Sequence, residues 1–176
     1  MPIAYKLLRE KNGILYPLYV LANIPTPIGQ WISAQDGPAA NTPDHVKSRL
    51  GDLAFRPGWH LSPLPLATHI GVKDASGKIV AMHPDTVWCE CEYHDTICYQ
   101  SEADSNGWKN GRFDKRRAML RHIPENGYYH YKTNPKMFMD WIIAGEMKII
   151  RVLSDDDVAE ICRAAGVTPL PRAKAM

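Results

Sequence analysis

The chain has 176 residues, with 21 lysines and arginines against 19 aspartates and glutamates, and a formal charge of +2. A charge this close to balance does not by itself indicate a nucleic-acid partner, and no apolar run of about eighteen residues is present to cross a membrane. The N-terminal segment lacks the pattern of a signal peptide, and the four cysteines do not resemble a disulfide framework, so we expect a cytoplasmic protein.

The first half of the chain predicts short strands joined by turns. Apolar runs on both sides of the Asn-Gly pair at 12–13 indicate a β-hairpin, because both residues readily take a positive φ. A Thr-Pro pair is typical of a helix start, and it predicts a short helix over 43–50. The segment 59–62 is expected to be extended and to pass into a short helix over 63–67, and two short strands are expected around 76–77.

The second half predicts alternating strands and helices from its apolar periodicity and its capping residues. Strands are expected over 86–93, 127–132 and 146–153, helices over 112–123, 135–144 and 155–165, and a polar loop over 101–111. Together these elements predict a single α+β domain over 1–166, with a mostly antiparallel twisted sheet and a few short helices. We expect residues 167–176 to be a flexible C-terminal tail.

A cluster of cysteine and histidine side chains at 89–98 is a possible zinc site. Thiolates and imidazoles bind zinc well. The first two cysteines, however, are two residues apart on a predicted strand, which places them about 6–7 Å apart on one face. We therefore interpret them as small apolar residues of the core and do not favour a metal, while zinc stays an alternative. The four candidate ligands are Cys89, Cys91, His94 and Cys98.

Basic residues gather in the predicted helix over 112–123 and just before it. Such clusters can bind phosphate groups, although a solvated helix face is the more usual explanation. They are Lys109, Arg112, Lys115, Arg116, Arg117 and Arg121. The sequence contains no P-loop, no dinucleotide-binding glycine motif, no nucleophile elbow and no zincin motif, which excludes the enzyme classes that depend on them.

The segment "GWHLSPLPLA" at 58–67 resembles the central nicotinamide-site element of ADP-ribosyltransferases, in which a glycine precedes a strand ending in Ser or Thr and an alanine lies in the following helix. The resemblance implies NAD as the cofactor. It also implies that Ser62, with His60 beside it, holds the nicotinamide ribose, and that Arg9 at the end of the first strand lies near the phosphates.

The same resemblance requires a late carboxylate that steadies the oxocarbenium-like charge as nicotinamide leaves. Glu146, which opens the last predicted strand, is the best candidate, although it does not sit in the family's E-x-E pattern. Asp140 precedes "WIIAG" but falls within the predicted helix over 135–144. The implied catalytic residues are therefore Glu146, Ser62 and Arg9, and the implied NAD-binding residues are Arg9, His60 and Ser62.

A resemblance over most of the chain is carried by "YKLLR", "RPGWH" and "MKIIRVL". These motifs resemble a group of uncharacterised proteins of bacteriophages and prophages, which implies action in the host bacterial cytoplasm. We expect an ADP-ribosyltransferase-like enzyme that modifies a host protein or nucleic acid. The alternatives are a non-enzymatic inhibitor of a host defence or replication protein, with Trp31, Trp108 or the basic helix as anchors, and a small zinc- or nucleic-acid-binding module.

Overall fold

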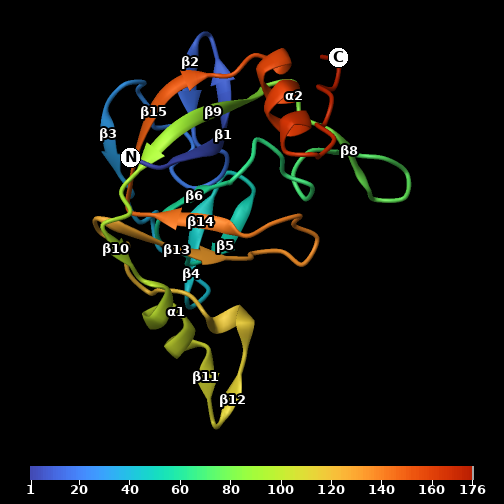
Figure 1. Ribbon diagram of the computed structural model, residues 1–176. Helices are drawn as coiled ribbons and strands as arrows, with labels where there is room; N and C mark the ends of the chain where they lie inside the picture. The colour runs from blue at the N-terminus through green and yellow to red at the C-terminus, as the bar shows by residue number, and fades with distance from the viewer. Residues whose placement is uncertain (176) are drawn as a thin grey trace.

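Two mainly antiparallel sheets pack against each other at the centre of the protein (Figure 1). The structure is a computed structural model, and it describes residues 1–175. The first sheet has the strand order β2-β1-β9-β15-β3, and the second has the order β10-β13-β14-β6, in which β10 and β13 are parallel. The strands of the first sheet are β1 (Ile3–Lys11), β2 (Ile14–Tyr16), β3 (Trp31–Ser33), β9 (Thr86–Tyr93) and β15 (Glu146–Val152). Those of the second are β6 (Trp59–Leu61), β10 (Ile97–Cys98), β13 (Gly127–Tyr131) and β14 (Trp141–Ala144).

Three two-stranded hairpins and two α-helices surround these sheets. The hairpins are β4 (His45–Ser48) with β5 (Gly51–Ala54), β7 (Val72–Lys73) with β8 (Ile79–Ala81), and β11 (Trp108–Lys109) with β12 (Arg112–Phe113). The helices are α1 (Gln100–Asn106) and α2 (Asp155–Ala164), and a short 3₁₀ turn covers Lys115–Arg117. Neither α-helix of residues 1–175 is long and apolar enough to cross a membrane. The predicted class, a single α+β domain with mostly antiparallel sheet, is confirmed.

One backbone bridge joins the two sheets. The N–H of Tyr5 on β1 donates to the carbonyl of Ser62 at 2.8 Å, and the N–H of Ser62 donates back to Tyr5 at 2.7 Å. The strands β13, β14, β6, β1, β9 and β15 are therefore neighbours in that order, although β1 and β6 meet only at this bridge. Because the two strands diverge beyond it, the two sheets can pack face to face.

The core between the sheets contains the cysteines of β9. Cys89 and Cys91 are fully buried, and they pack with side chains of both sheets, including Leu61 of β6 and Ile149 of β15. The interpretation of these two cysteines as core residues is confirmed. Trp88, on the opposite face of β9, is also buried, and it packs in a second apolar cluster with residues of α2.

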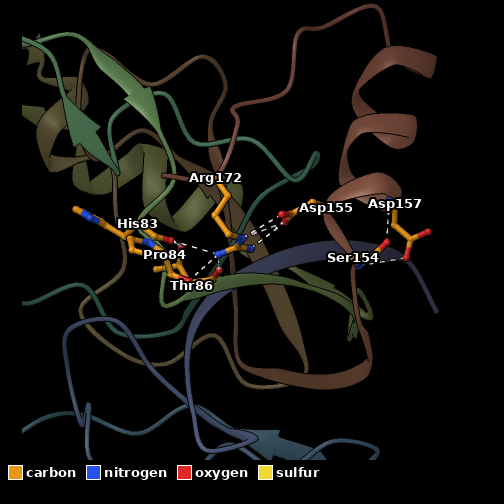
Figure 2. A network of polar contacts seen from close by, with 7 residues as sticks. All are labelled: His83, Pro84, Thr86, Ser154, Asp155, Asp157 and Arg172. Carbon is orange, nitrogen blue, oxygen red and sulfur yellow. Dashed lines mark hydrogen bonds and ion pairs between the residues drawn. The ribbon is translucent and has the colours of Figure 1, made fainter. Parts of the chain in front are cut away.

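Local signals explain the elements that the sequence predicted correctly. Asn12 and Gly13 have φ values of 53° and 79°, as a two-residue turn between twisted strands requires, and β1 pairs with β2 around them. Helix α2 begins at a complete capping box, in which the Ser154 side chain accepts from the N–H of Asp157 and the Asp157 carboxylate accepts from the N–H of Ser154 (Figure 2).

The helices predicted over 43–50, 63–67, 112–123 and 135–144 are wrong. Residues 45–48 form β4 and 63–67 form irregular turns. The basic segment contains the strand β12 and a 3₁₀ turn that the Asp114 side chain caps at the N–H of Arg116. Residues 141–144 are the strand β14, paired with β13 on one side and β6 on the other. Pairing with distant strands outweighed the local helix signal at 134–135, which closes only a short turn. The predicted loop over 101–111 contains most of α1 and β11.

The segment after α2, expected to be flexible, follows the protein surface with specific contacts as far as residue 173. The Met82 N–H donates to Pro171 at 2.8 Å, and the Ala173 N–H donates to Met82 at 2.9 Å. The guanidinium of Arg172 binds the Asp155 carboxylate and donates to the carbonyls of Pro84 and Thr86 (Figure 2). Residue 176 lies outside the described residues.

Candidate functional site

A cleft of about 520 Å³ opens beside the junction of β1 and β6, and we call it the ligand cleft. Segments 17–26 and 32–37, the β4–β5 hairpin and residues 54–60 contribute much of its wall. Its other lining residues are Lys6 and Leu7 of β1, together with His69, Ile70, Thr133, Asn134 and Trp141. Pockets that hold small ligands in proteins span about 300–1,000 Å³, so the volume suits a molecule of nucleotide size.

Lys6 is a half-buried cation of the ligand cleft. The strand β1 alternates, so Lys6 lies on the same face as Ala4 and Leu8, which belong to the core between the sheets. Its Nζ donates to the carbonyl of His60 at 3.1 Å and lies 5.8 Å from the centre of a Trp59 ring. Burial lowers the pKa of Lys6 from 10.5 to about 8, although the neighbouring thiols of Cys91 and Cys89 oppose this shift. The side chain is therefore mostly charged at neutral pH, and it forms no ion pair within residues 1–175.

Two histidines of the cleft are kept neutral. Burial, with a smaller contribution from the charge of Lys6, lowers the pKa of His60 to about 3. Its Nδ1 lies 3.2 Å from the carbonyl of Gly58, which can only accept, so Nδ1 carries the proton and Nε2 is left as an acceptor. Burial also lowers the pKa of His69 to about 4. Both rings lie edge-on to the indole of Trp141, with centroids 6.0 Å and 5.4 Å away.

Two nitrogen atoms that line the cleft region are buried without a hydrogen-bond partner in the described chain. They are Nε of Arg56 and Nδ1 of His69. The Arg56 guanidinium packs 5.7 Å from the centre of the Tyr131 ring, and it forms no salt bridge with any carboxylate of residues 1–175. Unsatisfied buried donors are uncommon in folded proteins because each costs about 1–3 kcal/mol. Because both atoms have almost no accessible surface, a ligand in the cleft would reach them only if the side chains that cover them moved.

Two indoles give the cleft aromatic surface and are fixed by their own hydrogen bonds. Trp141 Nε1 donates to the Thr133 hydroxyl at 2.9 Å, and Trp59 Nε1 donates to the carbonyl of Ile32 at 2.9 Å. Against the cations Lys6 and Arg56, the carboxylate of Asp36 is the only acidic side chain among the described lining residues. The cleft therefore combines positive charge with flat apolar surfaces, which suits an anion that carries aromatic rings.

The structure brings only one of the four predicted site residues into the cleft, and that residue is His60. Ser62 is buried at the backbone bridge to Tyr5 and does not line the cleft. Arg9 donates to the carbonyls of Pro17 and Ala22. It therefore fixes the wall segment 17–26 but does not itself line the cleft.

Glu146 lies far from Arg9 in the first sheet. It opens β15 beside Met147, which pairs with the Tyr93 end of β9, whereas Arg9 pairs with Thr86 at the other end of β9. The Glu146 carboxylate accepts from the N–H of Asn126. Arg9, Ser62 and Glu146 are therefore not assembled as one set.

The four candidate zinc ligands are also not assembled. Cys89 and Cys91 lie in the core, where burial raises the pKa of both thiols to about 12, whereas Cys98 is exposed. His94 stacks on Trp31, with ring centroids 4.0 Å apart. Within residues 1–175, no three His, Cys, Asp or Glu side chains are grouped to hold a metal ion.

Sequence reasoning missed Lys6, Arg56 and Trp141 and gave His69 no role. Lys6 carried a signal, because it is a cation on the otherwise apolar face of the alternating strand 3–11. The others come from turns and from a strand that was predicted to be a helix, so no local pattern places them near β1. Comparison with protein-family models, with curated proteins and with solved structures found no match, so the function is inferred from the ligand cleft itself.

Proposed function

We propose that the ligand cleft binds NAD and that the protein is an ADP-ribosyltransferase. The observation that carries the proposal is the pair of cations, Lys6 and Arg56, that line one cleft without a carboxylate partner in an ion pair. Partly buried cations without a carboxylate partner lower the stability of the fold, and a pyrophosphate bound in the cleft would neutralise both. The half-buried indole of Trp59 supplies a flat surface for the nicotinamide or adenine ring, whereas Trp141 is buried behind the two histidines.

The cleft includes one residue that the resemblance at 58–67 implicates, His60, whereas Ser62 lies outside its lining and 63–67 is not a helix. In ADP-ribosyltransferases the corresponding strand holds the nicotinamide ribose, and here this strand is β6, whose His60 lines the cleft. A neutral His60 with a free Nε2 can accept a hydrogen bond from a ribose hydroxyl. Arg9 then has an indirect role, because it fixes the wall segment 17–26 rather than touching NAD.

The transfer step requires a carboxylate beside the ribose. The bond from C1′ of the ribose to nicotinamide breaks with its electron pair leaving on nicotinamide, and an acceptor nucleophile bonds to C1′ and loses a proton. A nearby carboxylate stabilises the positive charge that develops on the ribose. Two aspartates are candidates, namely Asp36, which lines the cleft, and Asp140, which directly precedes the cleft residue Trp141 at the start of β14. Asp140 lies just before the strand and not within a helix, which supports it as a candidate, although it does not line the cleft.

Incubation of the protein with NAD labelled in its adenylate part tests this proposal. A bacterial lysate is the source of acceptors, because the chain resembles phage proteins. We expect label to be transferred to a macromolecule by the wild type, and Arg56→Gln to reduce the transfer at least tenfold through loss of a phosphate contact. Treating the product with protease and with nuclease then identifies the acceptor class.

Matched variants identify the carboxylate and separate catalysis from folding. Either Asp36→Asn or Asp140→Asn should lower the transfer of label about 100-fold or more without weakening NAD binding. Glu146→Gln should transfer label as the wild type does. Asp156→Asn, on the first turn of α2 and outside the cleft lining, is the control. The absence of transfer by the wild type, or full transfer by both Asp36 and Asp140 variants, would contradict the proposed activity.

A further inference from the structure

The hairpin β11–β12 projects from the second sheet beyond α1, at the end of the molecule opposite α2 (Figure 1). Residues 107–117, which we call the projecting hairpin, contain β11, β12 and the 3₁₀ turn. The chain reverses at Asn110 and Gly111, whose φ values of 52° and 73° suit the tight turn between the two strands.

An exposed aromatic pair lies across the two strands of this hairpin. Trp108 and Phe113 are directly opposite each other, with ring centroids 5.4 Å apart, and they are 61% and 46% exposed. The Phe113 ring packs so closely on Gly107 that a side chain at that position would clash with it. The pair is therefore held in place on its inner side while much of its surface faces solvent.

Cations without carboxylate partners flank the aromatic pair, and two of them lie on the other face of the hairpin, because successive side chains of a strand alternate between its faces. Lys109 lies directly opposite Arg112, one step nearer the tip than the aromatic pair, and like charges in that position destabilise a hairpin. In residues 1–175, neither of these side chains nor Lys115 forms a salt bridge. Arg116, whose side chain is 89% exposed, shares Asp114 with Arg117. The projecting hairpin therefore presents five cations and one carboxylate around two exposed rings.

We propose that the projecting hairpin binds a single-stranded nucleic acid that wraps around it, with unpaired bases stacked on Trp108 and Phe113 on one face and phosphates bound by the flanking cations Lys109, Arg112 and Lys115. Proteins that bind single strands without sequence preference combine these two features, because every base has a flat face and every nucleotide carries a phosphate. Binding would also relieve the repulsion between the two cations of the hairpin. The inference goes beyond the proposed NAD chemistry and does not depend on what the ligand cleft binds.

The order of residues along the hairpin favours nucleic acid over a membrane surface. A membrane-binding loop places its aromatic side chains at the tip and its cations behind them, at the level of the headgroups. Here Lys109 and Arg112 lie nearer the tip than Trp108 and Phe113, and the turn carries Asn110 and Gly111. Insertion of the rings would therefore carry two charges into the apolar layer, which is costly.

Fluorescence anisotropy of a labelled twenty-nucleotide oligothymidylate, titrated with the intact protein, tests this inference. We expect saturable binding at 50 mM salt and weaker binding to a duplex. The double variant Trp108→Ala/Phe113→Ala should bind at least tenfold more weakly, and Trp108→Phe should keep most of the affinity because it retains a stacking ring. The double variant Lys109→Gln/Arg112→Gln should lower the slope of log K against log salt by about 1.4.

Two variants outside the projecting hairpin serve as matched controls. Phe138→Ala removes another exposed aromatic ring, and Lys47→Gln/Lys73→Gln removes two exposed lysines elsewhere. Both should bind the oligonucleotide as the wild type does. The inference is overturned if the wild type does not bind the oligonucleotide at 50 mM salt, or if the hairpin variants bind it as tightly as the controls do. It is also overturned if the hairpin variants keep oligonucleotide binding and lose only binding to anionic vesicles. NAD binding is measured on the same variants and should not change, so failure here and failure of the NAD proposal are distinguishable.

Discussion

Replacing Lys6 with methionine should weaken NAD binding about 30-fold or more and at the same time make the protein more stable. Burial lowers the Lys6 pKa from 10.5 to about 8, so keeping the ammonium charged at neutral pH costs about 3 kcal/mol of folding free energy. Methionine fills the same space without a charge, and the hydrogen bond to His60 and the contact with the Trp59 ring are lost, together at about 1–1.5 kcal/mol. We therefore expect a net gain of about 2 kcal/mol, together with the loss of a buried phosphate contact.

The opposite signs of these two effects separate a ligand-binding lysine from a structural one. Thermal unfolding and urea titration at pH 7 measure the stability, and calorimetric titration with NAD measures the affinity. Lys11→Met, at the exposed end of the same strand, is the control and should change neither quantity by much. A Lys6→Met protein that is less stable than the wild type and binds NAD normally would show that Lys6 supports the fold instead.

Acid should destabilise the protein between pH 6.5 and about pH 4 because of His60 and His69. The pKa of each is depressed in the folded state, to about 3 and about 4, while in the unfolded chain it returns to 6.5. Between these values the unfolded chain binds more protons, so the stability that the neutral histidines contribute is fully present above about pH 6.5 and is lost as the pH falls. From pH 7.5 to pH 5 we expect a loss of about 3 kcal/mol, of which the more exposed His69 supplies about 1 kcal/mol.

Urea unfolding at pH 7.5 and pH 5 measures this loss. The double variant His60→Gln/His69→Gln should lose at least about 2 kcal/mol less than the wild type over the same interval. His130→Gln, which removes an exposed histidine of β13, should follow the wild type. Equal losses in the wild type and in the double variant would mean that the two cleft histidines are not held neutral by burial.

Much of the sheet could be predicted from local pattern, and the helices mostly could not. The Asn-Gly turn at 12–13, the alternation at 86–93 and the capping box at Ser154 each determine a structure through residues close in sequence. Residues 141–144 carry a preceding helix-start signal, yet they form the middle strand between β13 and β6. Their partners lie at 59–61 and 128–131, and a local pattern contains no information about such pairing.

The ligand cleft could be predicted only in part for the same reason. His60 was found because its strand carries a recognisable motif, and Arg9 and Glu146 were named because each stands at an end of a predicted strand. The strand register keeps Arg9 and Glu146 apart, because they lie near opposite ends of β9. Lys6, in contrast, contacts His60 where β1 approaches β6. Arg56 and Trp141 reach the cleft from a turn and from a strand mistaken for a helix. Their positions depend on how the two sheets pack.

Calorimetric titration of NAD into the wild-type protein at pH 7 and low salt tests the central claim most directly. We expect saturable binding of one NAD per chain. Binding should be greatly weakened in Arg56→Gln and retained in Arg163→Gln, which removes an exposed arginine of α2. Because the phosphates would be bound by Lys6 and Arg56, nicotinamide riboside should bind much more weakly than NAD. No saturable binding of NAD, or equal binding by the wild type and Arg56→Gln, would contradict the account.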